Sequence, residues 1–310
     1  MTTTTAPLPL LLEEVEVVRL ERLSPAFLRV ELGSPALAER GVPLRSYDLR
    51  VKLLFPADCH PLPSFAGASD DWYAEWLARP AAERGHLRTY TVRGVRGTGE
   101  HTRLVVDVVC HDGATGPAGR WAERAAPGDR RVAMAPRRGQ AYGGIEFAPG
   151  DSDALLLVGD ETAVPAVAAI LEQLDPAARG AVFLEVPTGA DVLAVQHPVG
   201  VSVRWLPRDG APRGAALHAT VLAHLGAAVT WAEPVAVDPD LWETPSYSSA
   251  GEPVETATRA VGRDWHGLYA WVAGEAKVVT GLRRALVRDL GLDRHQVAFM
   301  GYWRDGVAMK

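Results

Sequence analysis

The 310-residue sequence predicts two domains, an antiparallel β-barrel followed by a doubly wound α/β sheet. From residue 15 to 147, short β-branched segments, often alternating apolar and polar, are separated by turns containing Gly, Pro and Asp. From about residue 148, continuous apolar strands alternate with helical segments, a pattern typical of parallel strands buried on both faces. We therefore expect domains at 1–148 and 149–310.

The first domain is expected to hold six strands and little helix, which favours a small antiparallel barrel. A short helix, DDWYAEWLARPAAERG, is expected ahead of the fourth strand. The six segments are VEVVRLERL, FLRVEL, DLRVKLLF, RTYTVRGV, RLVVDVVCH and RRVAMA.

The second domain is expected to form a parallel sheet with helices between its strands. Residues 233–264, rich in Pro, Ser and Glu, are expected to form a surface excursion from it. The expected strands are ALLLVG, AVFLEV, VSVRWLP, LYAWVAG and QVAFMGYW, with helices at AVPAVAAILEQL, AALHATVLAHL and EAKVVTGLRRALVRDLG.

Composition excludes several classes of protein. A net charge of −6 argues against a protein that coats nucleic acid, although a local basic pocket remains compatible with it. Two cysteines, Cys59 and Cys110, are too few for a disulfide scaffold, and no spacing suggests a metal site. The amino terminus lacks a basic region, and no segment approaches the ~20 apolar residues of a membrane span. We expect a cytoplasmic monomer.

Two segments of the first domain carry candidate chemistry. Arg88 in RTYT lies in an apolar neighbourhood, where a buried guanidinium needs an anion, and the Tyr90 ring suits a flat partner. Residues 116–119, GPAG, precede an expected helix whose first amides could bind phosphate. On spacing alone, an ordinary loop and helix is the favoured explanation of the second segment.

Three segments of the second domain end strands at the edge where nucleotides bind in α/β sheets. They are GDETA after the first strand, Gly274-Glu275 after LYAWVA, and Trp303-Arg304 at the end of the last strand. The glycine spacing of the first differs from GxGxxG. Each alone is compatible with a structural turn or with core packing.

Five motifs in this order resemble the siderophore-interacting protein family: RTYT, HDGATGPAGRWA, LLVGDETAVPA, AWVAGEA and AFMGYWR. That family comprises FAD-dependent ferric-siderophore reductases of the ferredoxin–NADP reductase-like superfamily. The resemblance covers residues 15–304. It implies an FAD-binding barrel domain followed by an NAD(P)H-binding domain.

The resemblance also implies roles for individual residues. Arg88 is expected to meet the flavin diphosphate, Tyr90 to pack on the isoalloxazine, and Thr91 to bond near its N5 edge, which makes Tyr90 and Thr91 the catalytic candidates. The remaining cofactor-binding residues implied are His111, Gly116, Pro117, Ala118 and Trp121 for FAD, Asp160, Glu161, Thr162, Gly274 and Glu275 for NAD(P)H, and Trp303 and Arg304 near the flavin.

Many siderophore complexes are anionic, so basic side chains beside the motif strands are candidates for substrate binding. Arg50, Lys52, Arg93 and Arg304 are those candidates, with solvated surface charge as the alternative for each. A denser cluster, Arg130, Arg131, Arg137 and Arg138, cannot be directed at a site from the sequence. No metal ligands of the protein itself are expected.

The sequence departs from the family pattern in three places. Gly119 follows Ala118 where Ser is usual, which removes a hydroxyl that could contact phosphate. Leu49 and Arg50 replace the Gln and His of the family's DQHxKLLF. The chain also ends soon after Arg304, whereas some relatives carry a further helix.

The expected function is cytosolic reduction of a ferric siderophore by NAD(P)H through FAD, with release of Fe(II) for iron assimilation. One alternative is a flavin-linked NAD(P)H reductase with a protein or small organic acceptor, and another is a siderophore-binding protein without turnover. Glu185 ends the second parallel strand, where an acid can bond the ribose hydroxyls and repel a 2′-phosphate. NADH is therefore expected over NADPH, unless Arg204 or Arg208 receives the phosphate.

Overall fold

The computed structural model describes residues 8–41, 45–57, 60–110, 116–140, 143–227, 241–245, 247–249 and 265–307. The chain splits into two compact units, Met1–Ile145 and Glu146–Lys310, each with its own apolar core. This division lies close to residue 148, where the character of the sequence changes. Where the functional domains begin and end stays a prediction.

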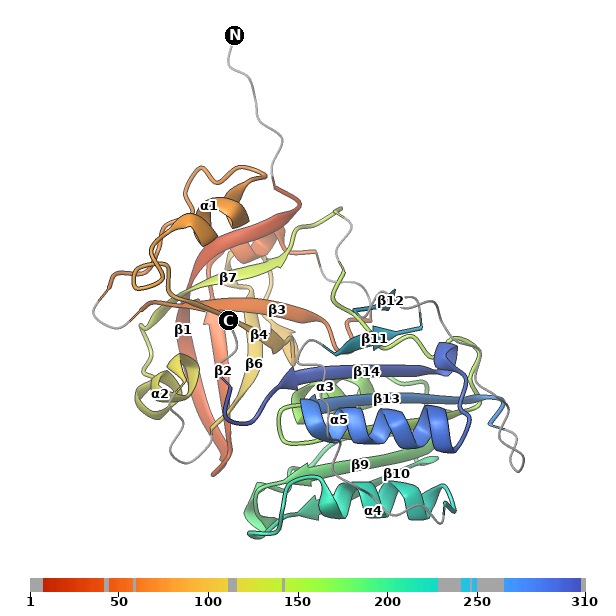
Figure 1. Ribbon diagram of the computed structural model, residues 1–310. Helices are drawn as coiled ribbons and strands as arrows, with labels where there is room; N and C mark the ends of the chain where they lie inside the picture. The colour runs from red at the N-terminus through yellow and green to blue at the C-terminus, as the bar shows by residue number, and fades with distance from the viewer. Residues whose placement is uncertain are drawn as a thin grey trace. The chain divides into compact units, whose positions relative to one another are not determined.

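The first unit is a seven-stranded antiparallel sheet in the order β4-β3-β7-β1-β2-β6-β5 (Figure 1). The expected RTYTVRGV strand is two strands, β4 and β5, because pairing changes from β3 to β6 within it. The strands are β1 (Leu10–Ser24), β2 (Phe27–Gly33), β3 (Arg50–Phe55), β4 (His86–Thr91), β5 (Gly94–Arg96), β6 (Arg103–Val109) and β7 (Arg130–Pro136).

The connection between β4 and β5 forces this sheet to curl. The two strands stand at opposite ends of the sheet order, yet only Val92 and Arg93 separate them in the chain. Two residues span no more than about 10 Å between the flanking strand ends. The Val92 amide donates to Leu49 O and the Arg93 amide to Val105 O, each at 2.8 Å, so the link bonds to both sides of the gap. The antiparallel barrel class predicted from sequence is confirmed, in the form of a half-barrel.

The concave face of this sheet is apolar and is covered at one end by helix α2 (Pro117–Arg124). Alternation along β3 directs Val51, Leu53 and Phe55 into the core. Trp121 of α2 is buried in the same core, and its Nε1 donates to Asp129 Oδ2 at 2.7 Å. A smaller cluster lies around Trp76 of α1 (Trp72–Ala78), the short helix expected ahead of β4.

The second unit is a seven-stranded mixed sheet in the order β10-β9-β8-β13-β14-β11-β12, of which the first five are parallel (Figure 1). The strands are β8 (Ala154–Gly159), β9 (Gly180–Val186), β10 (Val201–Pro207), β11 (Trp242–Thr244), β12 (Tyr247–Ser248), β13 (Leu268–Glu275) and β14 (Val297–Trp303). The helices are α3 (Val164–Leu171), α4 (Ala215–His224) and α5 (Ala276–Arg283), the last continuing as a π-helical segment, Arg284–Asp289. The doubly wound class predicted from sequence is confirmed.

The strand order reverses between β8 and β13, so these two strands form the topological switch point of the sheet. Their carboxyl ends, Gly159-Asp160 and Gly274-Glu275, lie beside each other. Gly274 has a φ of +144°, and a Cβ there would lie 2.7 Å from Asp160 Cγ. Only glycine allows the two strand ends to approach this closely.

The expected surface excursion at 233–264 needs a correction. Its described part, 241–245 and 247–249, includes β11 and β12, and β11 pairs antiparallel with β14. The Glu243 carboxylate is buried and accepts hydrogen bonds from Arg283 at 2.5 and 3.0 Å. These residues extend the sheet edge, because a buried ion pair ties them to α5. The rest of the range lies outside the described residues.

Within the described part of the chain, no helix is both long and apolar enough to cross a membrane. No group of three or more His, Cys, Asp or Glu residues in those same ranges is arranged to hold a metal ion.

Candidate functional site

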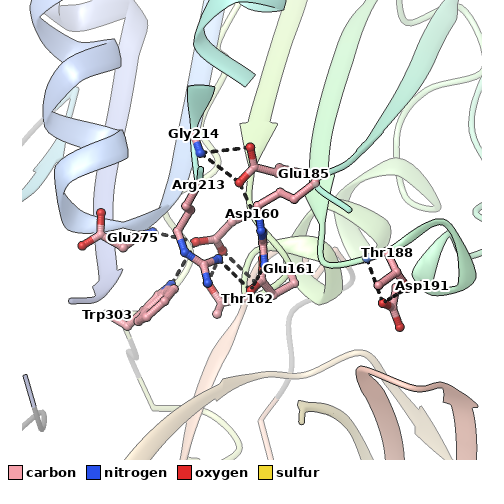
Figure 2. Close-up of polar contacts among 11 residues, drawn as sticks. Asp160, Glu161, Thr162, Glu185, Thr188, Asp191, Arg213, Gly214, Glu275 and Trp303 are labelled. Atoms are coloured by element: carbon pink, nitrogen blue, oxygen red, sulfur yellow. Dashed lines mark hydrogen bonds and ion pairs between the residues drawn. The ribbon is translucent and has the colours of Figure 1, made fainter. Parts of the chain in front are cut away.

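Asp160 joins three strand ends of the second unit through one buried carboxylate (Figure 2). Its Oδ1 accepts from the Thr162 amide at 2.8 Å and from the Thr162 hydroxyl at 2.5 Å. Its Oδ2 accepts from the Glu275 amide at 2.8 Å and from Trp303 Nε1 at 2.9 Å. Burial, and then the charge of Glu161, raises the pKa of the Asp160 carboxyl, while the hydrogen bonds from Thr162 and Trp303 act the other way.

Glu161, the next residue, is completely buried and paired with two arginines. Arg208 bonds both of its oxygens, at 2.7 and 3.0 Å, and Arg213 bonds Oε1 at 2.7 Å. Burial acts to raise the pKa of Glu161, but the arginines outweigh it and the pKa lies below the ordinary value. Glu161 therefore remains a carboxylate at neutral pH.

Arg213 connects this carboxylate to Trp303 at the end of β14. Its guanidinium carbon lies 4.6 Å from the centroid of the Trp303 ring, a cation–π contact. The structure thus brings Asp160, Glu161 and Thr162 into one polar network with Trp303 (Figure 2). The first three were expected to face the nicotinamide nucleotide, and Trp303 was expected near the flavin.

Glu275 belongs to the same network but acts as a helix cap. Its Oε2 accepts from the amides of Lys277 and Val278 at the start of α5, at 2.7 and 3.1 Å. Its Oε1 accepts from the Asp305 amide at 3.2 Å. The Glu275 carboxylate is thus engaged with backbone amides, and its expected place in a nucleotide site stays a prediction.

Glu185 does not have the environment expected of a ribose-binding acid. Its side chain is 0% exposed, both oxygens accept from the Gly214 amide at 3.0 Å, and Oε1 accepts from Arg208 at 3.2 Å. Burial raises the pKa of Glu185, opposed by the Gly214 hydrogen bond and by Arg208. The acceptor oxygens are already bonded inside the fold, and the expected ribose role stays a prediction. The same contacts engage Arg208, one of the alternative receivers of a 2′-phosphate.

In the first unit, Arg88 is a half-buried cation without a carboxylate partner among the described residues. Its Nη1 donates to Leu87 O at 2.9 Å, and burial lowers the pKa of its guanidinium. Strand pairing places Arg88 opposite Leu53 and Tyr90 opposite Val51, so both lie on the core face of β4. A partly desolvated guanidinium in this position fits an anionic ligand.

An aromatic cluster lies beside Arg88. The Tyr90 and Phe55 rings are 6.2 Å apart, and the Phe55 and Trp121 rings are 5.4 Å apart. Arg131 lies over the Trp121 ring at 4.6 Å and over Phe55 at 5.3 Å. Burial raises the pKa of the Tyr90 hydroxyl and lowers that of the Arg131 guanidinium, whose Nε has no hydrogen-bond partner in the described ranges. The cluster combines flat apolar surfaces with two cations.

The amino terminus of α2 lies in the second FAD motif. Gly116 is its N-cap, Pro117 occupies the first turn, and no side chain caps the helix. The first-turn amides, including that of Ala118, therefore resemble the phosphate-binding start of a helix. Together with Arg88 and the Tyr90 ring, these groups fit the diphosphate and ring system of FAD. His111, expected in the same motif, lies outside the described residues.

Thr91 and the first two substrate candidates lie on the opposite face of β4 and β3. Arg50 pairs with Thr91 and Lys52 with Thr89, and Lys52 Nζ donates to the Thr89 hydroxyl at 3.1 Å. Burial, and then the charge of Arg50, lowers the pKa of Lys52. The strand therefore separates Thr91 from Arg88 and Tyr90, with two neighbouring cations on the Thr91 side.

Arg93, a third candidate for substrate binding, takes part in an ion pair. Its side chain is 11% exposed and lies 3.7 Å from Asp107, a buried acid that Arg29 also bonds at 2.7 and 2.8 Å. Arg93 and Arg29 thus share one carboxylate in an ion-pair cluster on the sheet, and the substrate role of Arg93 stays a prediction. Arg304 forms a short bridge with Val307, and its substrate role stays a prediction.

Phe55, Arg131 and Arg213 lie in the two clusters but were not expected there from the sequence. Arg131 begins an alternating segment whose residues 133 and 135 face the core, so the alternation places Arg131 on the same face. Its strand partner Val15 is also a core residue. Arg213 follows a turn after the third parallel strand, and only the buried Glu161 explains its position. Such pairings join distant segments and are not periodic in the sequence.

Two family models match this chain. The siderophore-interacting FAD-binding domain matches residues 16–140, and the siderophore-interacting protein model matches 152–306. The chain belongs to the siderophore-interacting protein family. Both matches fall within the units that hold the two clusters described above.

Curated relatives include named reductases. A ferric vibriobactin reductase of Vibrio cholerae is 28% identical over 94% of this chain and 89% of its own length. An NADPH-dependent ferric-chelate reductase of Escherichia coli is 33% identical over 63% of this chain and 71% of its own length. An uncharacterized protein of Mycobacterium tuberculosis is 36% identical, and the match spans 66% of that protein.

Solved structures share the fold along nearly the whole chain. A siderophore utilization protein from T. fusca has a TM-score of 0.68 and 28% identity, covering 97% of this chain and 95% of that one. The siderophore-interacting protein SipS from Aeromonas hydrophila has a TM-score of 0.65 and 25% identity, covering 96% and 92%. A ferredoxin reductase of carbazole 1,9a-dioxygenase, with a TM-score of 0.55, 16% identity and coverage of 96% and 70%, shares the fold.

Proposed function

We propose that this family member is a flavin-dependent oxidoreductase that transfers electrons from NAD(P)H to a ferric siderophore. Residues 1–148 are the FAD-binding domain and 149–310 the NAD(P)H-binding domain in this proposal. The observation that carries it is the half-buried Arg88 beside an aromatic cluster and an uncapped helix start, in the unit that matches a siderophore-interacting FAD-binding domain. The reductase names of two relatives support the reaction class.

Arg88 and the first amides of α2 would hold the diphosphate of FAD, because a charge-assisted guanidinium contact and oriented N–H groups both favour an anion. Tyr90 offers a ring face for the isoalloxazine. When bound there, FAD would supply the redox chemistry, namely hydride acceptance and single-electron donation. The protein's own contribution is binding, orientation and the electrostatic surroundings.

Reduction itself releases the metal from the substrate. Fe(III) is held tightly by anionic oxygen chelators, while Fe(II), with its lower charge, is held far more weakly. Arg50 and Lys52 lie on one face of β3 and are the remaining candidates there for binding an anionic chelate. The protein then needs no iron ligands of its own.

The test is steady-state turnover of ferric chelates with NADH and with NADPH, using a ferrous-specific chelator to record Fe(II). We expect a yellow protein with one FAD per chain, weaker binding of FMN, and reduction of at least one siderophore complex. Protein that takes up no FAD would overturn the flavin assignment. Turnover of organic or protein acceptors but of no ferric chelate would favour a general flavin-linked reductase, and binding without turnover would favour a siderophore-binding protein.

The choice between NADH and NADPH has to be made without Glu185, because that carboxylate is bonded within the fold. Just beyond β9, Thr188 and Asp191 also bond each other, through a hydroxyl contact of 2.8 Å (Figure 2). The preference for NADH was based on a Glu185 carboxylate available to the ribose, and the structure does not support that basis. Comparing kcat/KM for the two donors with one ferric chelate decides the preference.

A further inference from the structure

The turn after β8 uses its own backbone amides. The amides of residues 162, 163 and 164 donate to Asp160 Oδ1, Asp160 O and Glu161 O, at 2.8, 3.0 and 3.3 Å. The next residue, Pro165, has no N–H group. In dinucleotide-binding sheets, amides at this place bind the diphosphate. Here they are bonded inside the turn, so a phosphate needs a different donor.

The surroundings of the turn are acidic. Asp160, Glu161, Glu185 and Glu275 are at most 2% exposed, and each carboxylate is engaged in hydrogen bonds within the cluster. Acids near the switch point oppose the approach of an anionic ligand, and the arginines paired with Glu161 and Glu185 offset part of that charge. An anionic ligand therefore needs a cation of this cluster that reaches the surface.

Arg213 is the cation that meets this need (Figure 2). Its side chain is 25% exposed, compared with 10% for Arg208, which bonds both Glu161 and Glu185. An arginine has five N–H donors. Nη1 of Arg213 bonds Glu161, and the guanidinium is held over the Trp303 ring. This pairing orients the group at the carboxyl ends of β8 and β14.

We propose that Arg213 binds the diphosphate of the nicotinamide dinucleotide, taking the place of the amides that the β8 turn bonds internally. This inference rests on the proposed NAD(P)H-dependent function. The diphosphate is favoured over the 2′-phosphate of NADPH because Arg213 is anchored to the first strand's turn at the switch point. The 2′-phosphate is recognised beyond the second strand, where Glu185 faces into the fold.

The experiment measures dissociation constants of NAD⁺ and NADP⁺ by calorimetry on the FAD-loaded protein and on Arg213→Gln and Arg213→Lys. We expect Arg213→Gln to weaken both nucleotides about tenfold, the effect of one charge-assisted contact. Arg213→Lys should recover part of the loss, since it keeps the charge without the planar fork. The dependence of binding on salt should also be shallower in Arg213→Gln, because one screened charge is gone.

Arg179→Gln is the matched control. Arg179 is an exposed arginine that precedes β9, so it lies at the amino ends of the parallel strands, opposite to the carboxyl ends where Arg213 lies. The Arg179→Gln variant should bind both nucleotides like the wild type. Equal affinity of Arg213→Gln and wild type, or a loss confined to NADP⁺, would overturn the diphosphate assignment. So would Arg213→Lys binding no better than Arg213→Gln. If Arg213→Gln does not fold, wild-type affinity in Arg213→Lys would overturn the assignment in its place. No binding by the wild type would instead remove the nucleotide-dependent function.

Discussion

At the residue scale, Asp160 shows why an acid is required at the end of β8. Both of its oxygens accept two hydrogen bonds, from donors on three segments of the chain. An asparagine would present N–H groups to N–H donors on one side, so it could not replace all four contacts. The residue therefore sets the relative positions of Thr162, Glu275 and Trp303 before any ligand arrives.

Arg88 gives a prediction at the same scale. Arg88→Ala should lower FAD affinity about tenfold or more, because a hydrogen bond to a charged group contributes roughly 1.5–3 kcal/mol. Fluorescence titration of the apoprotein with FAD measures the change. Arg130→Ala is the control, since Arg130 is 62% exposed and pairs with Glu14 on the surface. Unchanged FAD affinity in Arg88→Ala would show that the diphosphate lies elsewhere.

At the element scale, strand β4 presents different chemistry on its two faces. Strand alternation places Arg88 and Tyr90 with the core of the half-barrel and Thr91 with Arg50 on the other face. β4 also ends the sheet order, so its backbone pairs with β3 along one edge. A flat ligand that contacts both Tyr90 and Thr91 must therefore cross the edge or the end of this strand.

The contact between helices α4 and α5 includes a buried histidine that should make the stability of the protein depend on pH. His218 of α4 is buried, and its Nε2 lies 2.9 Å from Val278 O of α5, so Nε2 carries the proton and donates. Burial lowers the pKa of His218 from 6.5 to about 4, partly offset by that hydrogen bond. The unfolded chain therefore binds a proton at a higher pH than the folded protein does. Stability from this group is full above pH 6.5 and is lost as the pH falls toward 4.

His218→Gln tests this pH dependence, since glutamine can donate to Val278 O but does not titrate. Between pH 7 and 4 the wild type should lose on the order of 3 kcal/mol more stability than the variant, following the size of the pKa shift. Urea unfolding across this pH range measures the difference. A difference between wild type and His218→Gln that stays constant over this pH range would contradict the assignment.

At the scale of the whole molecule, two compact units with separate cores should respond separately to ligands. A ligand that binds only a folded unit stabilises that unit by mass action, by about 2.7 kcal/mol at a hundredfold excess over Kd. In scanning calorimetry we expect FAD to raise the midpoint temperature of one component of the unfolding transition, and NADP⁺ to raise the midpoint temperature of the other.

The variants provide matched controls for that experiment. Arg88→Ala should reduce the shift caused by FAD and leave the shift caused by NADP⁺, and Arg213→Gln should do the reverse. A single transition whose midpoint temperature both ligands raise equally would show that the units unfold together. That result would contradict the expectation that the two sites respond separately.

The fold classes, the two-part organisation and the family could all be predicted from the amino-acid sequence, because these depend on local periodicity and on ordered motifs. The period-two alternation of strands, the continuous apolar runs and the motifs RTYT and GDET can all be read directly in the sequence. The contacts of Glu185 and Arg93 were decided only by the tertiary structure, since their partners, Gly214 and Asp107, are distant in sequence. A buried charge is stabilised by whichever opposite charge or amide the fold brings to it, and no local pattern encodes that choice. For the same reason Arg213 became a candidate only once Glu161 was seen to hold it beside Trp303.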